Sequence, residues 1–176
     1  GHRIWVGPDY WTIRWQDWRV DDDLLRVESR PGRSCILLTH ELEHGDGEFE
    51  LRVTLSADGD ISVPAGIWAG VNGPVKDWRS AAAYGEYRLF AGVEPDGTIV
   101  LRDKSLQHSA TQATKIDTRR PFDLNLKSNA SGSSVAIELR ATQNQSDGQV
   151  SEMGAVHLEL DATSVQGLIG LGTADQ

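Results

Sequence analysis

The sequence is poor in cysteine, poor in basic side chains and free of long apolar runs, and each shortage excludes a class of protein. A single cysteine, Cys35, excludes an internal disulfide framework and a metal site built from cysteines alone. Against 26 Asp and Glu stand only 17 Lys and Arg, which gives a formal net charge of -9. A field of this sign repels phosphate backbones and anionic lipid surfaces, and no stretch approaches the ~20 apolar residues that cross a bilayer. Neither a nucleic acid nor a membrane is expected as a partner.

The length of the chain, 176 residues, is typical of one domain and is enough to bury a core without disulfides. We therefore expect a single domain over residues 1–176. The N-terminus lacks the basic, apolar and small-residue segments of a signal peptide. Cys35 lies in the apolar stretch "SCILLT", a setting typical of a small buried hydrophobe.

Apolar and polar residues alternate along most of the chain. In "EFELRVTLS", residues 48–56, every second side chain is apolar, which is the pattern of a half-buried strand. The same period predicts strands at 24–29, 35–40, 86–93, 98–103, 121–128, 134–141, 154–161 and 167–172. Turn residues separate these segments at 56–60, 94–97, 128–134 and 145–149.

No amphipathic helix of useful length interrupts this pattern, although "KDWRSAAAYGEY" (76–87) fits a helical turn or two as well as a tightly packed strand. Short strands at regular intervals are typical of an antiparallel sandwich rather than of alternating β and α units. We predict an all-β fold, an antiparallel two-sheet sandwich. The polar stretch 103–120 is predicted to be a long loop.

Several of these segments, in their order along the chain, resemble a known family. They are "WQDWRVDDDLLRVES" (15–29), "CILLTHELEHGDGEFELRVTLS" (35–56), "PAGIWAGV" (64–71), "PFDLNLKSNASGSSVAIELRAT" (121–142) and "GLIGLG" (167–172). Together they resemble the concanavalin A-like lectin/glucanase jelly roll in its laminin-G-like bacterial forms. The resemblance implies a jelly-roll sandwich in which a late strand pair supports a ligand-sized concavity.

A closer resemblance is to the jelly-roll domain that precedes metallophosphoesterases of the alkaline phosphatase D type. It rests on "WVGPDYW" (5–11), "WQDWRV" (15–20), "GIWAG" (66–70) and "DWRSAA" (77–82), with Trp15 and Trp78 departing from the family pattern. This resemblance implies an accessory domain of an exported bacterial enzyme, secreted or periplasmic, with an adjacent catalytic domain as partner. The phosphatase part is absent from these residues, so no phosphoesterase activity is assigned to them.

Catalytic carboxylates are the next question, because the glucanases of this family place acidic residues on one face of a strand. Only "HELEHGDGEFE" (40–50) has similar content, and Glu41 and Glu43 can share a strand face. A glutamate replaces the central aspartate of the family pattern, and "HGDG" then turns the chain. We favour a solvated edge and turn, and retain as an alternative a retaining glycoside hydrolase that uses Glu41 and Glu43.

Metal sites are weakly indicated. "DDD" at 21–23 and "SADGD" at 56–60 carry oxygen ligands suited to calcium, but Asp and Gly are equally ordinary turn residues. His40 and His44 have a zinc-like spacing only on a helix, and the surrounding pattern is strand and turn. We expect no cofactor and leave calcium open.

The tryptophans carry the remaining signal. For Trp5, Trp11, Trp15 and Trp18 we favour packing that fastens the N-terminal segment. A candidate carbohydrate site combines aromatic faces with polar groups near glycines; its residues are Trp68, Asn72, Asp77, Trp78, Arg79 and Tyr84. The competing interpretation is structural: Trp68 fills the core, Arg79 pairs with a carboxylate and Tyr84 packs.

These observations favour a non-catalytic accessory domain that binds a polysaccharide or glycan, or that positions a neighbouring catalytic domain. Two alternatives stay open. One is the glycoside hydrolase, and the other is a purely structural interaction module.

Overall fold

A computed structural model of the chain describes residues 2–3, 6–12, 15–43, 46–72, 87–105, 109–144 and 149–174. Within these ranges the structure consists of antiparallel strands and short 3-10 turns, η1 (Trp15–Asp17) and η2 (Ala162–Val165). None of the described helices is both long and apolar enough to cross a membrane. The predicted all-β class and its antiparallel sheets are confirmed.

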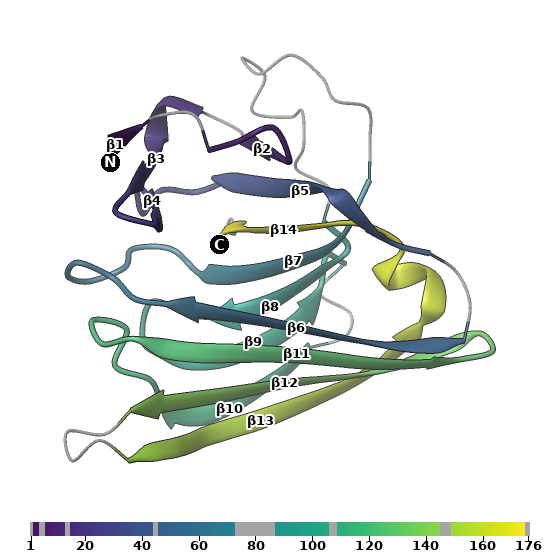
Figure 1. Cartoon of the computed structure of the whole chain (residues 1–176). Coiled ribbons are helices and arrows are strands. Elements are labelled where there is room, and N and C mark those ends of the chain that lie inside the picture. Colours follow the sequence, from purple (N-terminus) through teal and green to yellow (C-terminus); the bar gives the residue numbers. More distant parts are fainter. Residues whose placement is uncertain are drawn as a thin grey trace.

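The strands form three sheets, drawn in Figure 1. The large sheet has the order β10 (Ser109–Lys115), β9 (Thr98–Asp103), β8 (Leu89–Val93), β7 (Ala65–Val71), β14 (Gly167–Thr173), β5 (Ser34–Leu42) and β2 (Tyr10–Thr12). The small sheet has the order β13 (Val150–Asp161), β12 (Ser134–Asn144), β11 (Phe122–Ser131) and β6 (Gly47–Leu55). The N-terminal sheet has the order β1 (His2–Arg3), β3 (Trp18–Asp21) and β4 (Leu24–Val27).

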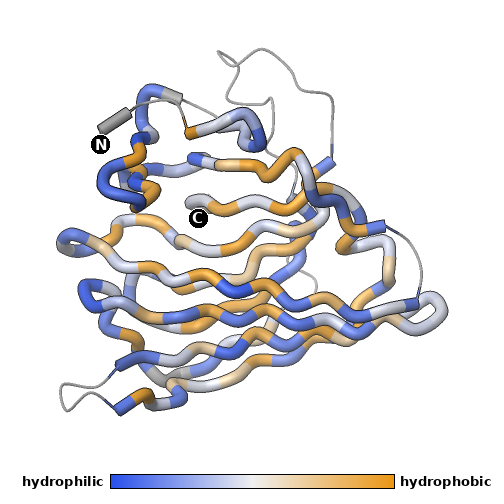
Figure 2. Tube along the Cα trace, in the orientation of Figure 1, coloured by the Kyte–Doolittle hydropathy of each residue, from blue (hydrophilic) through white to orange (hydrophobic). Residues whose placement is uncertain are grey.

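The main core lies between the large and the small sheet. Leu124, Leu126 and Leu139 of the small sheet are fully buried against Leu89 and Leu101 of the large sheet. Figure 2 shows the alternation that produces this layer, since apolar and polar residues succeed one another along the small-sheet strands. Burying one such side chain contributes about 1.5–3 kcal/mol.

The two sheets approach each other most closely at their β10 and β13 edges. A Cβ on Gly154 of β13 would lie 2.6 Å from Cγ of Gln112 on β10, so the Gln112 side chain would have to shift to admit one. The backbone of Gly154 has a φ of +149°, and the pairing of β12 with β13 shifts register beside it. A bulge of this kind bends the strand that carries it.

A second apolar cluster covers the opposite face of the large sheet. Trp68 and Phe90 belong to it, together with Ile36 and Val100. Because Trp68 lies between Ile67 and Ala69, which face the main core, its ring points to the other side of β7. Trp11 is half-buried against the same cluster.

Among the described residues, the Trp18 ring and the ion pair of Arg33 with Asp17 help to fasten the N-terminal sheet. Trp18 is 2% exposed and packs with Val6 and Cys35. Arg33 Nε lies 2.6 Å from Asp17 Oδ2, and their side chains are only 6% and 13% exposed. The "WQDWR" stretch therefore supplies a largely buried acid and a buried ring, which agrees with the packing role expected for Trp18.

Two sequence expectations need correction. The stretch 103–120 is not one loop, because β10 forms within it and pairs with β9. The turn expected at 128–134 is shorter, since β11 runs to Ser131 and β12 starts at Ser134. Gly132, with a φ of +62°, provides the left-handed residue that this tight turn requires.

Candidate functional site

Trp68, the centre of the expected carbohydrate site, is a packing residue in the structure. Its side chain is 2% exposed, and its ring centroid lies 4.6 Å from that of Tyr87. No face of the indole is available to a sugar ring. The burial of Trp68 therefore agrees with the structural interpretation and not with stacking.

Asn72, the second expected site residue, holds the backbone together. Its Nδ2 donates to the carbonyl of Gln166 (2.7 Å) and to that of Gly70 (3.2 Å). These bonds tie the end of β7 to the start of β14. Asp77, Trp78, Arg79 and Tyr84 lie outside the described residues, as do Trp5 and the side chain of Trp15.

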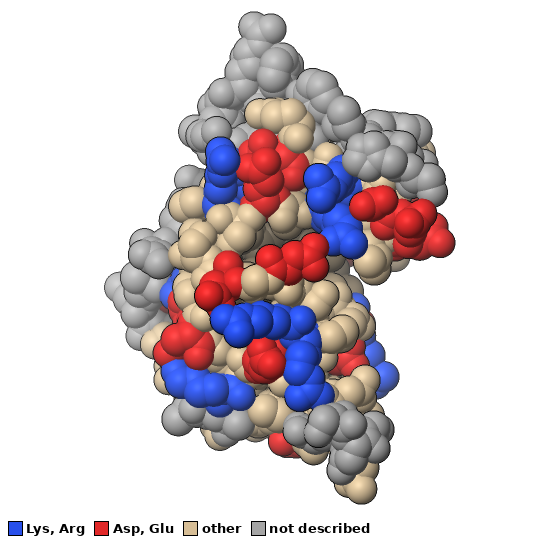
Figure 3. Space-filling model, turned by 90° about the vertical axis from the view of Figure 1, so that its left-hand side faces the viewer, with Lys and Arg blue, Asp and Glu red and all other residues tan. Residues whose placement is uncertain are grey.

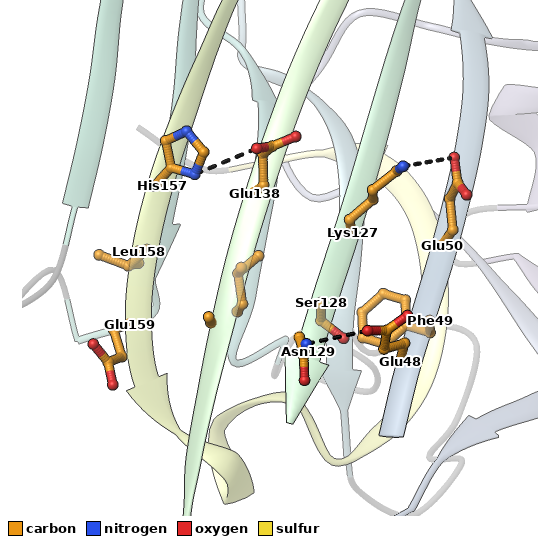
Figure 4. A pocket seen from close by; sticks show the side chains of 12 residues that line it. Glu48, Phe49, Glu50, Lys127, Ser128, Asn129, Glu138, His157, Leu158 and Glu159 are labelled. Atoms are coloured by element: carbon orange, nitrogen blue, oxygen red, sulfur yellow. Dashed lines mark hydrogen bonds and ion pairs between the residues drawn. The ribbon is translucent and has the colours of Figure 1, made fainter. Parts of the chain in front are cut away.

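A hollow lies elsewhere, on the outward face of the small sheet (Figure 4). It measures about 760 Å³ and is called the outer hollow here. Its outward-facing lining residues are Glu48, Glu50, Lys127, Asn129, Ala136, Glu138, His157 and Glu159.

Strand register arranges these side chains in rows across the sheet. One row runs His157, Glu138, Lys127, Glu50, because each residue is paired with the next on the neighbouring strand. The adjacent row runs Glu159, Ala136, Asn129, Glu48. The small, exposed Ala136 leaves a depression between the longer side chains of its row, which forms the floor of the outer hollow.

The charged groups of the outer hollow have partners within the protein. His157 Nδ1 lies 3.5 Å from Glu138 Oε2, and Lys127 Nζ lies 3.7 Å from Glu50 Oε1. The pKa of Glu50 is lowered, chiefly by a hydrogen bond from Arg52 and to a smaller extent by one from Asn125. Asn129 Nδ2 donates to Glu48 Oε1 at 3.1 Å. These contacts fix the side chains as an ordered set of donors and acceptors.

A second hollow lies where β5 ends and β6 begins, close to η2. It measures about 250 Å³ and is called the corner hollow here. Glu41 and Glu43 both line it, with Asp46 and Glu48. The structure thus brings the two expected catalytic glutamates together at one hollow. Asp46 accepts a 2.6 Å hydrogen bond from the backbone N–H of Gly132, so one of its oxygens is engaged by the β11–β12 turn.

The acidic residues considered for calcium lie in turns and ion pairs. Asp22 and Asp23 have φ values of 45° and 67° in the β3–β4 turn, and Asp58 and Asp60 pair with arginines. His40 Nδ1 is 2.9 Å from Thr39 Oγ1, and His44 is outside the described residues. In the part of the chain that the structure describes, no three His, Cys, Asp or Glu side chains are placed to hold a metal ion.

The resemblance implied a concavity on the late strand pair, but the residues that line the outer hollow were not identified from the sequence. Its polar residues are visible as the outward phase of four alternating strands, but they come together only through the strand order β13-β12-β11-β6. A row such as His157, Glu138, Lys127, Glu50 joins positions far apart in the chain. Strand phase is a local signal, whereas register between strands is not.

The chain was compared with family models, with characterised proteins and with solved structures, and no match was found in any of the three comparisons.

Proposed function

We propose that this chain is a non-catalytic β-sandwich module of the concanavalin A-like jelly-roll class that binds a neutral polysaccharide in the outer hollow. In this proposal it serves as an accessory domain of an exported bacterial enzyme. One observation carries the proposal: a hollow of about 760 Å³ whose lining combines carboxylates, an amide, an ammonium group and an imidazole.

The chemistry of that lining suits sugar hydroxyls, which donate to carboxylates and accept from ammonium and amide N–H groups. Hydrogen bonds to charged partners contribute about 1.5–3 kcal/mol each, more than those between neutral groups. Glu48, Glu50, Glu138 and Glu159 outnumber Lys127 and His157. The excess of carboxylates disfavours anionic polymers, so a neutral glycan is the ligand class.

Affinity electrophoresis tests this proposal with neutral soluble glucans, xylans and mannans, and with polygalacturonate as the anionic comparison. Asn129→Ala removes an amide from the lining, and Ala136→Leu fills the floor. Thr142→Ala on the same sheet, outside the lining, is the matched control.

We expect one neutral glycan to retard the wild type and Thr142→Ala but neither of the other variants. Retardation that persists in Asn129→Ala and Ala136→Leu would remove the outer hollow as the site. If no glycan retards the wild type, the carbohydrate proposal is overturned and a role in positioning a neighbouring domain is favoured.

The glycoside hydrolase alternative is supported by one observation, the joint presence of Glu41 and Glu43 at the corner hollow. A retaining mechanism requires a nucleophile and an acid with carboxyl groups ~5 Å apart. Release of reducing sugar by the purified chain, abolished by Glu43→Gln, would establish this alternative and overturn the non-catalytic proposal.

A further inference from the structure

The middle of the outer hollow has a floor of short side chains. Ala136 on β12 is paired with Asn129 on β11, and both are exposed. The next row toward the β11–β12 turn holds Ser134 and Ser131, which are also short and also paired. The floor of the outer hollow therefore crosses from β12 to β11 without a long side chain in its way.

Long side chains stand along the other side of this floor. They form the row His157, Glu138, Lys127, Glu50, which lies two residues further along each strand. Figure 4 shows this row, with Glu159, Asn129 and Glu48 in the row below it. The floor and this row together make a shelf that runs across the strands rather than along one of them.

A carboxylate stands at each end of the shelf. Glu159 lies on β13 and Glu48 on β6, the two outer strands of the small sheet, and both are exposed. Glu159 Oε1 accepts from Ser134 Oγ at 2.8 Å, and Glu48 Oε1 accepts from Asn129 Nδ2 at 3.1 Å. Both carboxylates are thus tied to residues of the floor. Because three interstrand steps separate β13 from β6, the ends of the shelf are ~14 Å apart.

The spacing of the strands suits an extended glycan. Neighbouring strands lie ~4.8 Å apart, and each pyranose unit of an extended β-1,4-linked chain advances that chain by nearly the same distance. A chain laid across the sheet therefore presents one sugar unit to each strand in turn. An α-1,4-linked chain curls into a helix and loses this correspondence. The volume of about 760 Å³ lies within the ~300–1,000 Å³ of ligand pockets, which suits an oligosaccharide segment.

We propose that the outer hollow binds an internal segment of an extended β-1,4-linked glycan that lies across the strands from Glu159 to Glu48. The bound segment has about three or four units, one for each strand that it crosses. Ala136 and Asn129 support its middle, and the row of long side chains bonds its hydroxyls along one side. This inference rests on the proposed function and adds to it the linkage, the direction and the length of the bound segment.

Isothermal titration calorimetry with oligosaccharides of two to six units tests the proposal. The probes are the β-1,4-linked series of glucose, xylose and mannose, with malto-oligosaccharides as the α-1,4-linked comparison. For one β-1,4 series we expect affinity to rise about tenfold from the disaccharide to the tetrasaccharide. It should then level off by the hexasaccharide, because further units extend past the hollow. Maltotetraose should bind at least about tenfold more weakly than the tetrasaccharide of that series.

Variants at the two ends of the shelf test the length of the bound segment. Glu159→Ala and Glu48→Ala each remove an outermost contact, so each should lower tetrasaccharide affinity to that of the trisaccharide and leave disaccharide affinity unchanged. Ala136→Leu fills the floor and should abolish binding at every length. Glu152→Ala is the matched control, since Glu152 is another exposed carboxylate of β13 that pairs with Arg140 outside the hollow. Amide NMR spectra of each variant without ligand verify that it is folded.

Two results would overturn this inference and leave the proposed function standing. One is equal affinity for the disaccharide and the tetrasaccharide, with binding still lost in Ala136→Leu. The other is binding of maltotetraose as tight as that of the β-1,4-linked tetrasaccharides. If no neutral glycan binds at all, the proposed function fails and this inference fails with it.

Discussion

The two ends of the sandwich carry similar charged side chains and treat them differently. At the end where β6 leads into β7, which Figure 3 shows, acidic and basic groups are interspersed. Arg26 Nη1 lies 2.8 Å from Asp58 Oδ2 there, and Arg119 Nη2 lies 2.5 Å from Asp60 Oδ1. At the opposite end, Glu41 and Glu43 meet no described cation. The paired end uses charge to hold loops together, whereas the described residues leave Glu41 and Glu43 without an ion pair.

The largest effect is expected when the buried pair beside the paired end is broken. Asp17→Ala leaves the Arg33 guanidinium buried without its carboxylate, which costs about 3–5 kcal/mol. Urea unfolding measures the loss, with Glu28→Ala as the control for an exposed pair. A loss below about 1 kcal/mol would show that the pair does not fasten the N-terminal sheet.

The Cys35 thiol provides an independent readout of the same fastening. Burial raises the pKa of this thiol to about 12, so the native protein should react slowly with a thiol reagent. In Asp17→Ala the labelling rate should rise, because Cys35 packs in one cluster with Trp18, which follows Asp17 in the chain. Equal labelling rates in the two proteins would show that the ion pair does not control the opening of that cluster.

Two buried hydroxyls, one near each end, allow the ends to be compared through effects on stability of intermediate size. Thr173, near the paired end, accepts from Arg33 N–H at 3.0 Å and donates to the Arg30 carbonyl. Thr173→Val should therefore cost about 1–3 kcal/mol. Ser128→Ala, at the corner hollow, should cost almost nothing or stabilise the protein. Thermal unfolding of both variants measures these changes in stability. A large loss of stability in Ser128→Ala would mean that the Ser128 hydroxyl has a structural partner.

A smaller effect concerns pH at the paired end. The pKa of Asp96 is lowered from 3.8 to about 2, chiefly by a hydrogen bond from Lys115 and to a smaller extent by one from Thr98. A carboxyl with a lowered pKa stabilises the fold above its unfolded pKa, and this contribution disappears as the pH falls from about 4 to about 2. Asp96→Asn should flatten the dependence of Tm on pH in that window. An identical dependence in both proteins would mean that Asp96 is not coupled to folding.

The smallest effect is expected at the corner hollow itself. Neutralising Glu41 and Glu43 removes repulsion between like charges, so the double glutamine variant should gain up to about 0.5 kcal/mol. Added salt should reduce the difference from the wild type, because it screens exposed charges. A loss of stability would indicate that the two glutamates have partners that hold the fold.

Strand positions were predictable where one face of a strand is buried. Alternation over 48–56 and 98–103 predicted β6 and β9, since apolar residues there meet the core at every second position. The β10 strand was missed because "SATQATK" has no apolar alternation; it is an edge strand that contributes mainly Ala110 to the core. Polar edge strands resemble loops in sequence.

The candidate sites were harder to predict, for two physical reasons. A tryptophan carries the same large apolar surface whether it packs in a core or stacks on a sugar, so Trp68 gave no local sign of its burial. Ser128 ends the strand predicted over 121–128 and also begins the turn predicted over 128–134, so the sequence left its state open, whereas β11 extends to Ser131. Glu41 and Glu43 were identified by composition, but their common hollow depends on the position of η2.

The position of β14 has a consequence for the order in which the chain folds. This strand is the last one in the described part of the chain. It lies between β5 and β7 and pairs with both. Until residues 167–173 leave the ribosome, β5 and β7 each expose an unpaired edge in the middle of the large sheet. Such non-local pairing slows folding and exposes strand edges to other chains. During synthesis, the time before β14 inserts is therefore when this protein is most prone to aggregate.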